Sequence, residues 1–239
     1  MIVGIKMNYS NSLLLIDVLL MYTGSINRKQ LMELTGMSIA SATRTFKTYR
    51  ESYPDNINYD IGKKRYKQSS TFNPGFDFHV ESALALIAYG RRIESSLYSN
   101  TIGPDEKCSS DHQLSREITS IITKAIYSSN RLSIHYLSSN SENEIREVVP
   151  TAIFESRKRW YMRVYDLEDN IYKNFKINRV NNVIASKCIG IISIPNDVHW
   201  ETPVVLTLAA HPKHPFPKGL KSDLGLDKKQ VFNLYTTDA

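Results

Sequence analysis

The spacing of apolar residues changes at about residue 130, and this change constrains the fold more than any other feature of the chain. Before Asn130 the apolar residues recur every three or four positions, as in NSLLLIDVLLMYTG from Asn11 to Gly24, which is the spacing of amphipathic helices. After Asn130 apolar and polar residues alternate in five short runs that polar turns separate. The sequence therefore predicts an α+β chain with helices first and a curled sheet or small barrel after them.

Helix-ending and helix-starting residues divide the first part of the chain into three helices. The first helix ends at Gly24, and Asn27 can cap a second helix that ends at Gly36. Ser38 can cap a third helix, which we expect to continue to about Tyr53. Short helices joined by a glycine-containing turn are typical of a helix-turn-helix motif.

The third helix has a chemically unusual outer face. Its apolar side chains Ala42, Phe46 and Tyr49 share the face that we expect to be buried. The outward residues and the cap are Ser38, Ser41, Thr43, Arg44, Lys47 and Thr48. Small side chains near the helix start permit close approach to a major groove, and the arginine can reach a base edge or a phosphate. A purely structural surface helix more typically carries Glu–Lys pairs, whereas glutamate is absent here until Glu51.

A basic hairpin is predicted after the third helix. The stretch INYDIGKKRYKQ fits two short strands joined by a turn at Ile61 and Gly62, with Lys63, Lys64 and Arg65 at the tip. Such a wing can contact backbone phosphates or the minor groove. Helix pattern, wing and charge agree with one another, so we favour a winged helix-turn-helix that binds DNA over a structural three-helix module.

Net charge supports a polyanionic partner. The chain has a formal net charge of +6, and the first seventy residues carry ten Lys and Arg against five Asp and Glu. An excess concentrated in one terminal domain suggests nucleic acid, although a basic surface can also be merely solvated. The longest apolar run, LLLIDVLLMY, is short and contains Asp17, which argues against a membrane span or a signal peptide. We therefore expect a cytoplasmic protein.

Residues 76–128 are predicted to be mostly helical, with a loop-like segment between two amphipathic stretches. Such a connector can carry a signal between domains or pack a dimer. Cys108 and Cys188 lie far apart in the sequence and without metal-type spacing, so neither a disulfide framework nor a zinc site is expected. His211 and His214 have no third ligand at a suitable spacing, so no metal site is expected there either.

The strand RKRWYMRVYD, from Arg157 to Asp166, combines aromatic and basic residues. If it is extended, Trp160, Met162 and Val164 face one way and Tyr161, Arg163 and Tyr165 face the other. The first set indicates a core, and the second indicates a surface able to bind an anion. The alternative is ordinary packing with a solvated opposite face.

Four motifs in this half resemble the WYL-domain transcriptional regulators of bacteria. They are IHY, REVVP, WYM in place of the usual Trp-Tyr-Leu, and FKINRV, in the family's order behind a winged helix-turn-helix. The resemblance covers about residues 1–194. Met162 in place of leucine is a volume-conserving apolar exchange.

The resemblance implies an Sm-like, SH3-like barrel that senses nucleic acid or a nucleotide-like molecule. The family's ligand-facing positions correspond to Tyr136, Arg146, Tyr161, Arg163 and Arg179. Arginines bind phosphates through two hydrogen bonds and tyrosines offer a stacking surface, so this set suits a nucleotide or a short single strand. Trp160 is interpreted as a core residue, and no role is assigned to His135.

We predict four segments along the chain. They are a winged helix-turn-helix at 1–72, a helical linker at 73–129, a WYL ligand-sensing domain at 130–195 and a short C-terminal α/β extension at 196–239. A strand from Val204 to Ala209 opens the extension, which then becomes proline-rich. In the family this region resembles the start of a dimerisation subdomain. About forty residues follow the predicted barrel here, so we expect this subdomain to be either minimal or incomplete.

Together these features predict a ligand-responsive DNA-binding regulator, a homodimeric repressor that binds operator duplexes and needs no cofactor. A nucleotide or oligonucleotide is the expected effector, and family members of this layout resemble controllers of phage-defence islands. The alternative is a single-stranded nucleic-acid-binding protein with the barrel as its main effector. An enzyme is not expected, because no carboxylate cluster, phosphate-binding glycine loop or nucleophile with an ordered base is present in the sequence.

Overall fold

The computed structural model describes residues 9–89, 114–138, 144–185, 193–209 and 231–237, together with Lys213, Gly219 and Ser222. The chain forms two compact units, Met1–Ile192 and Ser193–Ala239. The expectations for Cys108, Cys188, His211, His214 and the loop within the linker concern positions outside the described residues.

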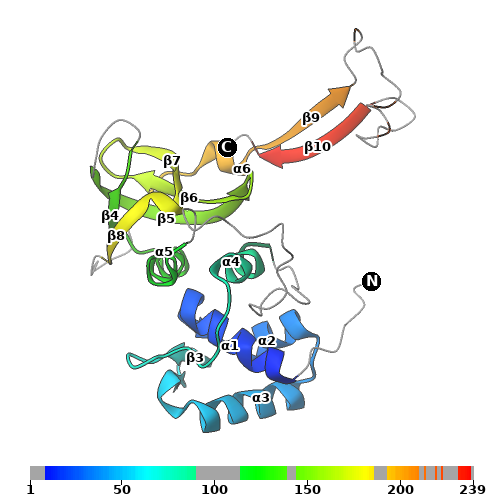
Figure 1. Ribbon diagram of the computed structural model, residues 1–239, viewed down its shortest axis with the longest axis vertical. Helices are drawn as coiled ribbons and strands as arrows, with labels where there is room; N and C mark the ends of the chain where they lie inside the picture. The colour runs from blue at the N-terminus through cyan, green and yellow to red at the C-terminus, as the bar shows by residue number, and fades with distance from the viewer. Residues whose placement is uncertain are drawn as a thin grey trace. The chain divides into compact units, whose positions relative to one another are not determined.

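The first unit begins with the predicted winged helix-turn-helix (Figure 1). Its helices are α1 (Tyr9–Thr23), α2 (Arg28–Thr35) and α3 (Ile39–Ser52), followed by the 3-10 helix η1 (Pro54–Asn56). Its strands are β1 (Ser25–Ile26), β2 (Ile57–Asp60) and β3 (Arg65–Gln68), in the order β1-β3-β2 with antiparallel pairing. The three helices and the two wing strands that the sequence predicts are thereby confirmed.

The helix ends follow from local side-chain chemistry. The Asn27 side chain accepts a hydrogen bond from the Gln30 backbone N–H, and the Gln30 side chain accepts one from the Asn27 N–H, so α2 starts with a capping box. Gly36 ends α2 with a φ of 71°, a conformation that glycine adopts without strain. Ser38 caps α3 by accepting from the Ser41 N–H.

Apolar packing fixes α3 against the rest of the domain. Phe46 and Tyr49 are fully buried, and the ring of Phe46 stacks on Tyr66 of β3 with centroids 4.2 Å apart. The core around them includes Leu14, Leu20 and other fully buried side chains of α1. Burial of this size orients α3 so that its opposite face meets solvent.

Two helices follow the wing. They are α4 (Val80–Tyr89) and α5 (Arg116–Ser128). Helix α5 contacts α1 on one side and strands β5 and β8 of the following sheet on another (Figure 1). Helix α5 is therefore one of the elements through which the winged domain and the sheet touch, and α4 also contacts β5.

The predicted alternating runs form one five-stranded antiparallel sheet. Its strands are β4 (Leu132–Tyr136), β5 (Glu144–Ser156), β6 (Arg159–Asp166), β7 (Ile171–Lys176) and β8 (Val180–Ala185), with the 3-10 helix η4 (Ile177–Arg179) before β8. The order is β7-β6-β5-β4-β8. Within the described ranges β7 and β8 do not pair with each other, and a barrel closes only when its edge strands do. The expected Sm-like, SH3-like barrel is therefore not confirmed.

The second unit is small. It contains α6 (Val198–Glu201), β9 (Pro203–Ala209) and β10 (Val231–Thr237), and the two strands pair in antiparallel register. The predicted strand near Val204 is confirmed, and β10 is an addition that the sequence analysis did not anticipate. None of the helices in the described ranges has the length and apolar character that a membrane crossing requires.

Candidate functional site

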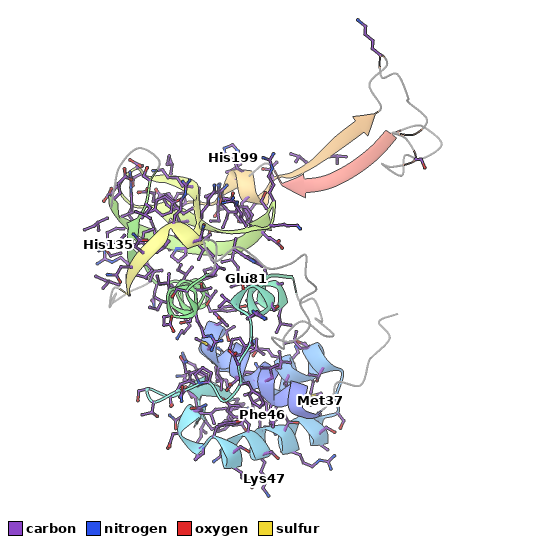
Figure 2. The ribbon with its side chains drawn as sticks, viewed as in Figure 1. Met37, Phe46, Lys47, Glu81, His135 and His199 are labelled. Atoms are coloured by element: carbon purple, nitrogen blue, oxygen red, sulfur yellow. The ribbon has the colours of Figure 1, made fainter. Side chains whose placement is uncertain are left out.

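Helix α3 separates an apolar face from a polar and basic one. Ala42, Phe46 and Tyr49 are fully buried, whereas Arg44 and Lys47 are exposed. Figure 2 shows Phe46 on the inner side of α3 and Lys47 projecting from its outer side. The burial pattern agrees with the periodicity on which the DNA-facing assignment was based.

A cleft of about 660 Å³ lies along this outer face. It is lined by Ser12, Met37, Ser41, Arg44, Thr45, Lys47, Thr48 and Glu51. Four of these eight residues belong to the predicted DNA-contacting set, so the structure brings that part of the set together on one surface. Ser38 and Thr43 are exposed on the same helix end, where Thr43 accepts a 3.4 Å hydrogen bond from Arg28.

The charged groups of α3 differ in how far they are engaged. Lys47 lies 3.8 Å from Glu51, but both side chains are largely exposed, so this ion pair is weak. Arg44 makes no ion pair with any of the residues that the structure describes. Its guanidinium is thus available to an external acceptor.

The wing places its basic residues at the tip of a hairpin. Lys63 and Lys64 are exposed and Arg65 is half-buried at the start of β3. Asp60 accepts from the Lys63 backbone N–H at 2.9 Å and pairs with Lys67 at 2.6 Å. The hydrogen bond from Lys67 holds the pKa of Asp60 below its ordinary value, so the carboxylate is occupied within the hairpin and leaves the tip cationic.

A buried carboxylate anchors the DNA-facing helix. Asp17 of α1 is fully buried and accepts hydrogen bonds from the Tyr49 hydroxyl and, at 3.0 Å, from the Phe76 backbone N–H. The Asn56 amide donates to the Tyr49 hydroxyl at 3.3 Å. Burial raises the pKa of Asp17 despite these donors. In the sequence, Asp17 stands out only as an interruption of an apolar run. Its position on the apolar face of the first helix was the signal that could have predicted a buried, hydrogen-bonded carboxylate.

The strand register distributes the predicted ligand residues over two faces of the sheet. Tyr136 is paired with Glu144, and Arg146 lies two residues further along the same strand, so both side chains share one face. Val148 continues that face and pairs with Asp166, which places Val164, Met162 and Trp160 there too. Tyr161 and Arg163 therefore lie on the opposite face.

The core assignment for β6 is confirmed. Trp160, Met162 and Val164 are all buried members of the hydrophobic core, with 6%, 0% and 0% of their surface exposed. The opposite face of β6 carries the aromatic and basic residues that the alternation predicted. His135, to which no role was assigned, is half-buried on β4 (Figure 2).

The face that carries Tyr161 is rich in aromatic rings. Tyr161 stacks on Phe154 with centroids 5.4 Å apart, and Tyr165 meets Tyr172 edge-on at 5.1 Å. Between these pairs lies Arg163, which is only 6% exposed and donates to Asn174 Oδ1 at 3.0 Å. Its guanidinium also lies 5.4 Å from the Tyr172 ring. This surface combines π-faces with a fixed cation.

Tyr136 points the other way, into the core. It is 7% exposed, its ring meets Phe175 edge-on at 4.5 Å, and its hydroxyl accepts from the Lys176 backbone N–H at 3.2 Å. Arg179 ends η4, is half-buried, and its carbonyl oxygen accepts from the Leu137 N–H at 2.9 Å.

Arg146 is enclosed by carboxylates. It donates to Glu144 at 2.9 Å, to Asp166 at 3.2 Å and to Asp169 at 2.8 Å. Asp166 is fully buried and also accepts from Lys173 at 2.9 Å. These acceptors engage Arg146 within the sheet, so its geometry is that of a structural ion-pair network.

Comparison with known families agrees with this architecture. Residues 8–87 match the BrxR transcriptional regulator winged helix-turn-helix domain, and residues 117–184 match the WYL domain. The α3 face and wing lie in the first range, and β4 to β7 lie in the second.

Two relatives of the chain are bacterial transcriptional repressors. The chain is 24% identical over 217 residues to the DNA-binding transcriptional repressor CapW of Escherichia coli strain KTE188, covering 87% of this chain and 72% of the relative. It is 24% identical over 220 residues to CapW of Pseudomonas aeruginosa, with the same coverage of 87% and 72%. These relatives are repressors rather than enzymes, in agreement with the sequence analysis.

A solved structure also aligns along the chain. The proteasome accessory factor B/C (PafBC) of Arthrobacter aurescens aligns over 98% of this chain with 14% identity and a TM-score of 0.29. This chain spans 43% of that protein's length. On the two domain matches and the sequence relatives, the protein joins a BrxR-type winged helix-turn-helix domain to a WYL domain and is homologous to the CapW transcriptional repressors.

Proposed function

We propose that this protein is a ligand-responsive transcriptional repressor that binds operator DNA through α3 and the wing. One observation carries the proposal: Ser41, Arg44, Lys47 and Thr48 of α3 line the same cleft. The opposite face of the helix is fully buried in the core. Small side chains and two cations on an exposed helix suit entry into a major groove. The names of the CapW relatives support the same function.

The predicted DNA contacts have three roles in this proposal. Arg44 reads a base edge, because it is exposed and unpaired among the described residues. Ser38, Ser41, Thr43, Lys47 and Thr48 line the approach of α3 to the groove. Lys63, Lys64 and Arg65 hold backbone phosphates from the wing. The protein then acts in the cytoplasm, where bacterial DNA lies.

We further propose that the WYL sheet senses a nucleic-acid or nucleotide-like effector on the face that carries Tyr161. Stacked rings beside the fixed guanidinium of Arg163 suit a base and its phosphate. Arg179 completes the set from the end of η4. In this proposal Tyr136 and Arg146 act indirectly, because one packs in the core and the other is held by carboxylates.

The sheet is proposed to curl as in an SH3-like barrel. Register shifts occur between Pro150 and Ala152 on β5 and between His135 and Tyr136 on β4. Bulges of this kind bend strands and increase their twist, so both favour a strongly curved sheet.

Helix α5 is the proposed route from effector to DNA. It packs on β5 and β8 of the sensing sheet and on α1 of the winged domain. Near its start, Arg116 donates to Asp77 at 2.7 Å and to the Phe78 carbonyl at 2.8 Å, which fixes the chain that enters α4. An effector that moves the sheet would move α5 and, with it, the winged domain.

Homodimerisation and a phage-defence role complete the proposal. Two winged domains would bind two half-sites, and the β9–β10 unit is the proposed dimerisation extension. The size of the protein in solution tests the dimer, and a neighbouring defence operon would support the biological role.

One titration tests the main proposal and its alternative. Purified protein is titrated against duplex fragments tiled across its own promoter, with unrelated duplex and single-stranded DNA as competitors. A discrete shift that survives duplex competitor supports the repressor. Preference for the single strand with no favoured fragment supports a single-stranded nucleic-acid-binding protein instead, an alternative that the aromatic face around Tyr161 motivates.

A further inference from the structure

The turn between β5 and β6 has an unusual composition for its geometry. Ser156 and Arg159 pair as the last rung of the hairpin, so Arg157 and Lys158 are its two central residues. Both have positive φ values, 50° and 59°. A two-residue turn with positive φ at both centres is normally built from Asn-Gly or Asp-Gly, because other side chains are strained there. This chain has two long cations in those positions.

The turn presents a dense positive charge to solvent. Arg157, Lys158 and Arg159 are consecutive and all exposed. In the part of the chain that the structure describes, none of the three forms an ion pair. The adjacent carboxylate, Glu155, pairs across the strands with Trp160 and therefore lies on the opposite face from Arg159. The cations are free to bind an external anion.

The same combination recurs at the wing. Of the five described non-glycine residues with positive φ, three are cations at hairpin tips: Lys64, Arg157 and Lys158. The other two have ordinary explanations, since Ser129 ends α5 and Asn170 is a residue type that tolerates this conformation. A less strained residue at these positions would stabilise the turns. That exposed cations occupy them instead is a sign of a binding role.

We propose that Arg157, Lys158 and Arg159 form a second phosphodiester-binding element, separate from α3 and the wing. Each guanidinium group can donate two parallel hydrogen bonds to the oxygens of one phosphate. A lysine between the two arginines adds a mobile point charge. No base edge needs to be read, so the contact is independent of sequence. The phosphates belong either to duplex DNA or to a single-stranded effector. The inference rests on the proposed function only in that the protein binds nucleic acid.

A double substitution tests both the strain and the charge of this turn. In the full chain, Arg157→Asn with Lys158→Gly installs the preferred turn residues and removes two cations. We expect the melting temperature to rise by about 2–4 °C, because asparagine and glycine adopt the positive φ values of this turn with less strain than arginine and lysine do. For the nucleic acid that the turn contacts, the slope of log affinity against log salt concentration should decrease in magnitude by about 1–2. The probes are an unrelated duplex and an oligodeoxythymidine of equal length.

Matched controls make the result specific. Asn170→Gly places glycine at the positive φ of the next turn without changing charge, so it should leave the affinity for both probes unaltered. Lys158→Gln removes one charge at the same turn and should reduce the salt slope without the gain in melting temperature. Loss confined to the duplex or to the oligodeoxythymidine supports the proposal and identifies the source of the phosphates.

The proposal is overturned if the double variant binds both probes with wild-type affinity and wild-type salt slope. Arg44→Ala, measured in parallel, distinguishes this failure from failure of the proposed function, because it alters the α3 surface and leaves the turn intact. If the wild-type protein binds neither duplex nor single strand, both proposals fall together.

Discussion

Nζ of Lys124 in α5 donates a 3.0 Å hydrogen bond to Oε1 of Gln68 in β3 and so joins α5 to the wing. The lysine stem packs 3.6 Å from the position that a Cβ on Gly24 would occupy, and the Gln68 backbone N–H donates to the Gly24 carbonyl at 2.9 Å. Burial lowers the pKa of Lys124. Helix, wing and the end of α1 therefore meet at one side chain.

Lys124→Met is expected to loosen the wing while keeping the apolar stem. Loss of the ammonium removes a hydrogen bond worth about 1 kcal/mol and frees Gln68 at the end of β3. Native-state hydrogen exchange at the Gln68 amide should therefore be faster. Lys47→Met, an exposed change on α3, serves as the control. Unchanged protection of Gln68 in Lys124→Met would contradict a role for α5 in holding the wing.

Arg44→Ala and Lys64→Ala are expected to weaken DNA binding in different ways. Arg44→Ala should cost about 1–3 kcal/mol on the operator and relax preference at one base pair. Lys64→Ala should weaken binding to all duplexes alike and reduce the salt slope by about 1. Fluorescence anisotropy with operator variants at several salt concentrations measures both effects. Equal loss across sequences for both variants would count against placing α3 in the groove.

Tyr136→Phe and Tyr161→Ala distinguish a core tyrosine from a binding tyrosine. Tyr136→Phe leaves the partly buried Lys176 N–H without this acceptor and should reduce the free energy of unfolding by about 1–3 kcal/mol. Tyr161→Ala loses a stacked pair and should cost about 1 kcal/mol or less in stability while weakening oligonucleotide binding. Chemical denaturation and oligonucleotide titration provide the readouts. The reverse outcome would return Tyr136 to the effector contacts.

The helices and strands could be predicted because their signals are local. Asn27, Gly36 and Ser38 act within one helical turn, so their residue types alone locate the ends of α2 and α3. The alternation in β6 likewise identifies its buried face, since successive side chains of one strand must point to opposite sides.

The arrangement of residues across strands could not be read from the sequence. Whether Tyr136 shares a face with Tyr161 depends on the pairing register of β4, β5 and β6, which no local signal fixes. The hydrogen bond from the Phe76 N–H to Asp17 joins residues 59 positions apart and was equally invisible. Whether the sheet closes into a barrel could not be predicted for the same reason, because closure depends on whether the two edge strands pair with each other.

Arg146→Met is expected to destabilise the sheet rather than to remove an effector contact alone. The change keeps much of the apolar stem but leaves the fully buried Asp166 with fewer donors, which should cost about 2–3 kcal/mol. Arg131→Met, a change to a more exposed arginine that pairs with Glu147 at 3.9 Å, is the control and should cost less. Urea denaturation of both variants gives the comparison. A stable Arg146→Met protein that no longer responds to nucleic acid would contradict the structural interpretation of this arginine.

Asp17→Asn is expected to change how stability depends on pH. Burial raises the pKa of Asp17 above its ordinary value of 3.8, so the folded protein binds this proton more tightly than the unfolded chain does. The corresponding contribution to the free energy of unfolding is complete below that ordinary value and is lost as the pH rises through the folded pKa. Asp17→Asn removes the titrating group, so this loss disappears.

The free energy of unfolding of wild type should thus fall more than that of Asp17→Asn as the pH rises from about 4 toward neutrality. Glu33→Gln, an exposed change on α2, corrects for the general effect of removing one carboxylate. Asp17→Ala should be less stable than Asp17→Asn by about 1–3 kcal/mol at neutral pH, because the Tyr49 hydroxyl and the Phe76 N–H then lose their buried acceptor. Parallel pH profiles for wild type and Asp17→Asn would show that Asp17 does not titrate differently on folding and would contradict a raised pKa for this carboxyl.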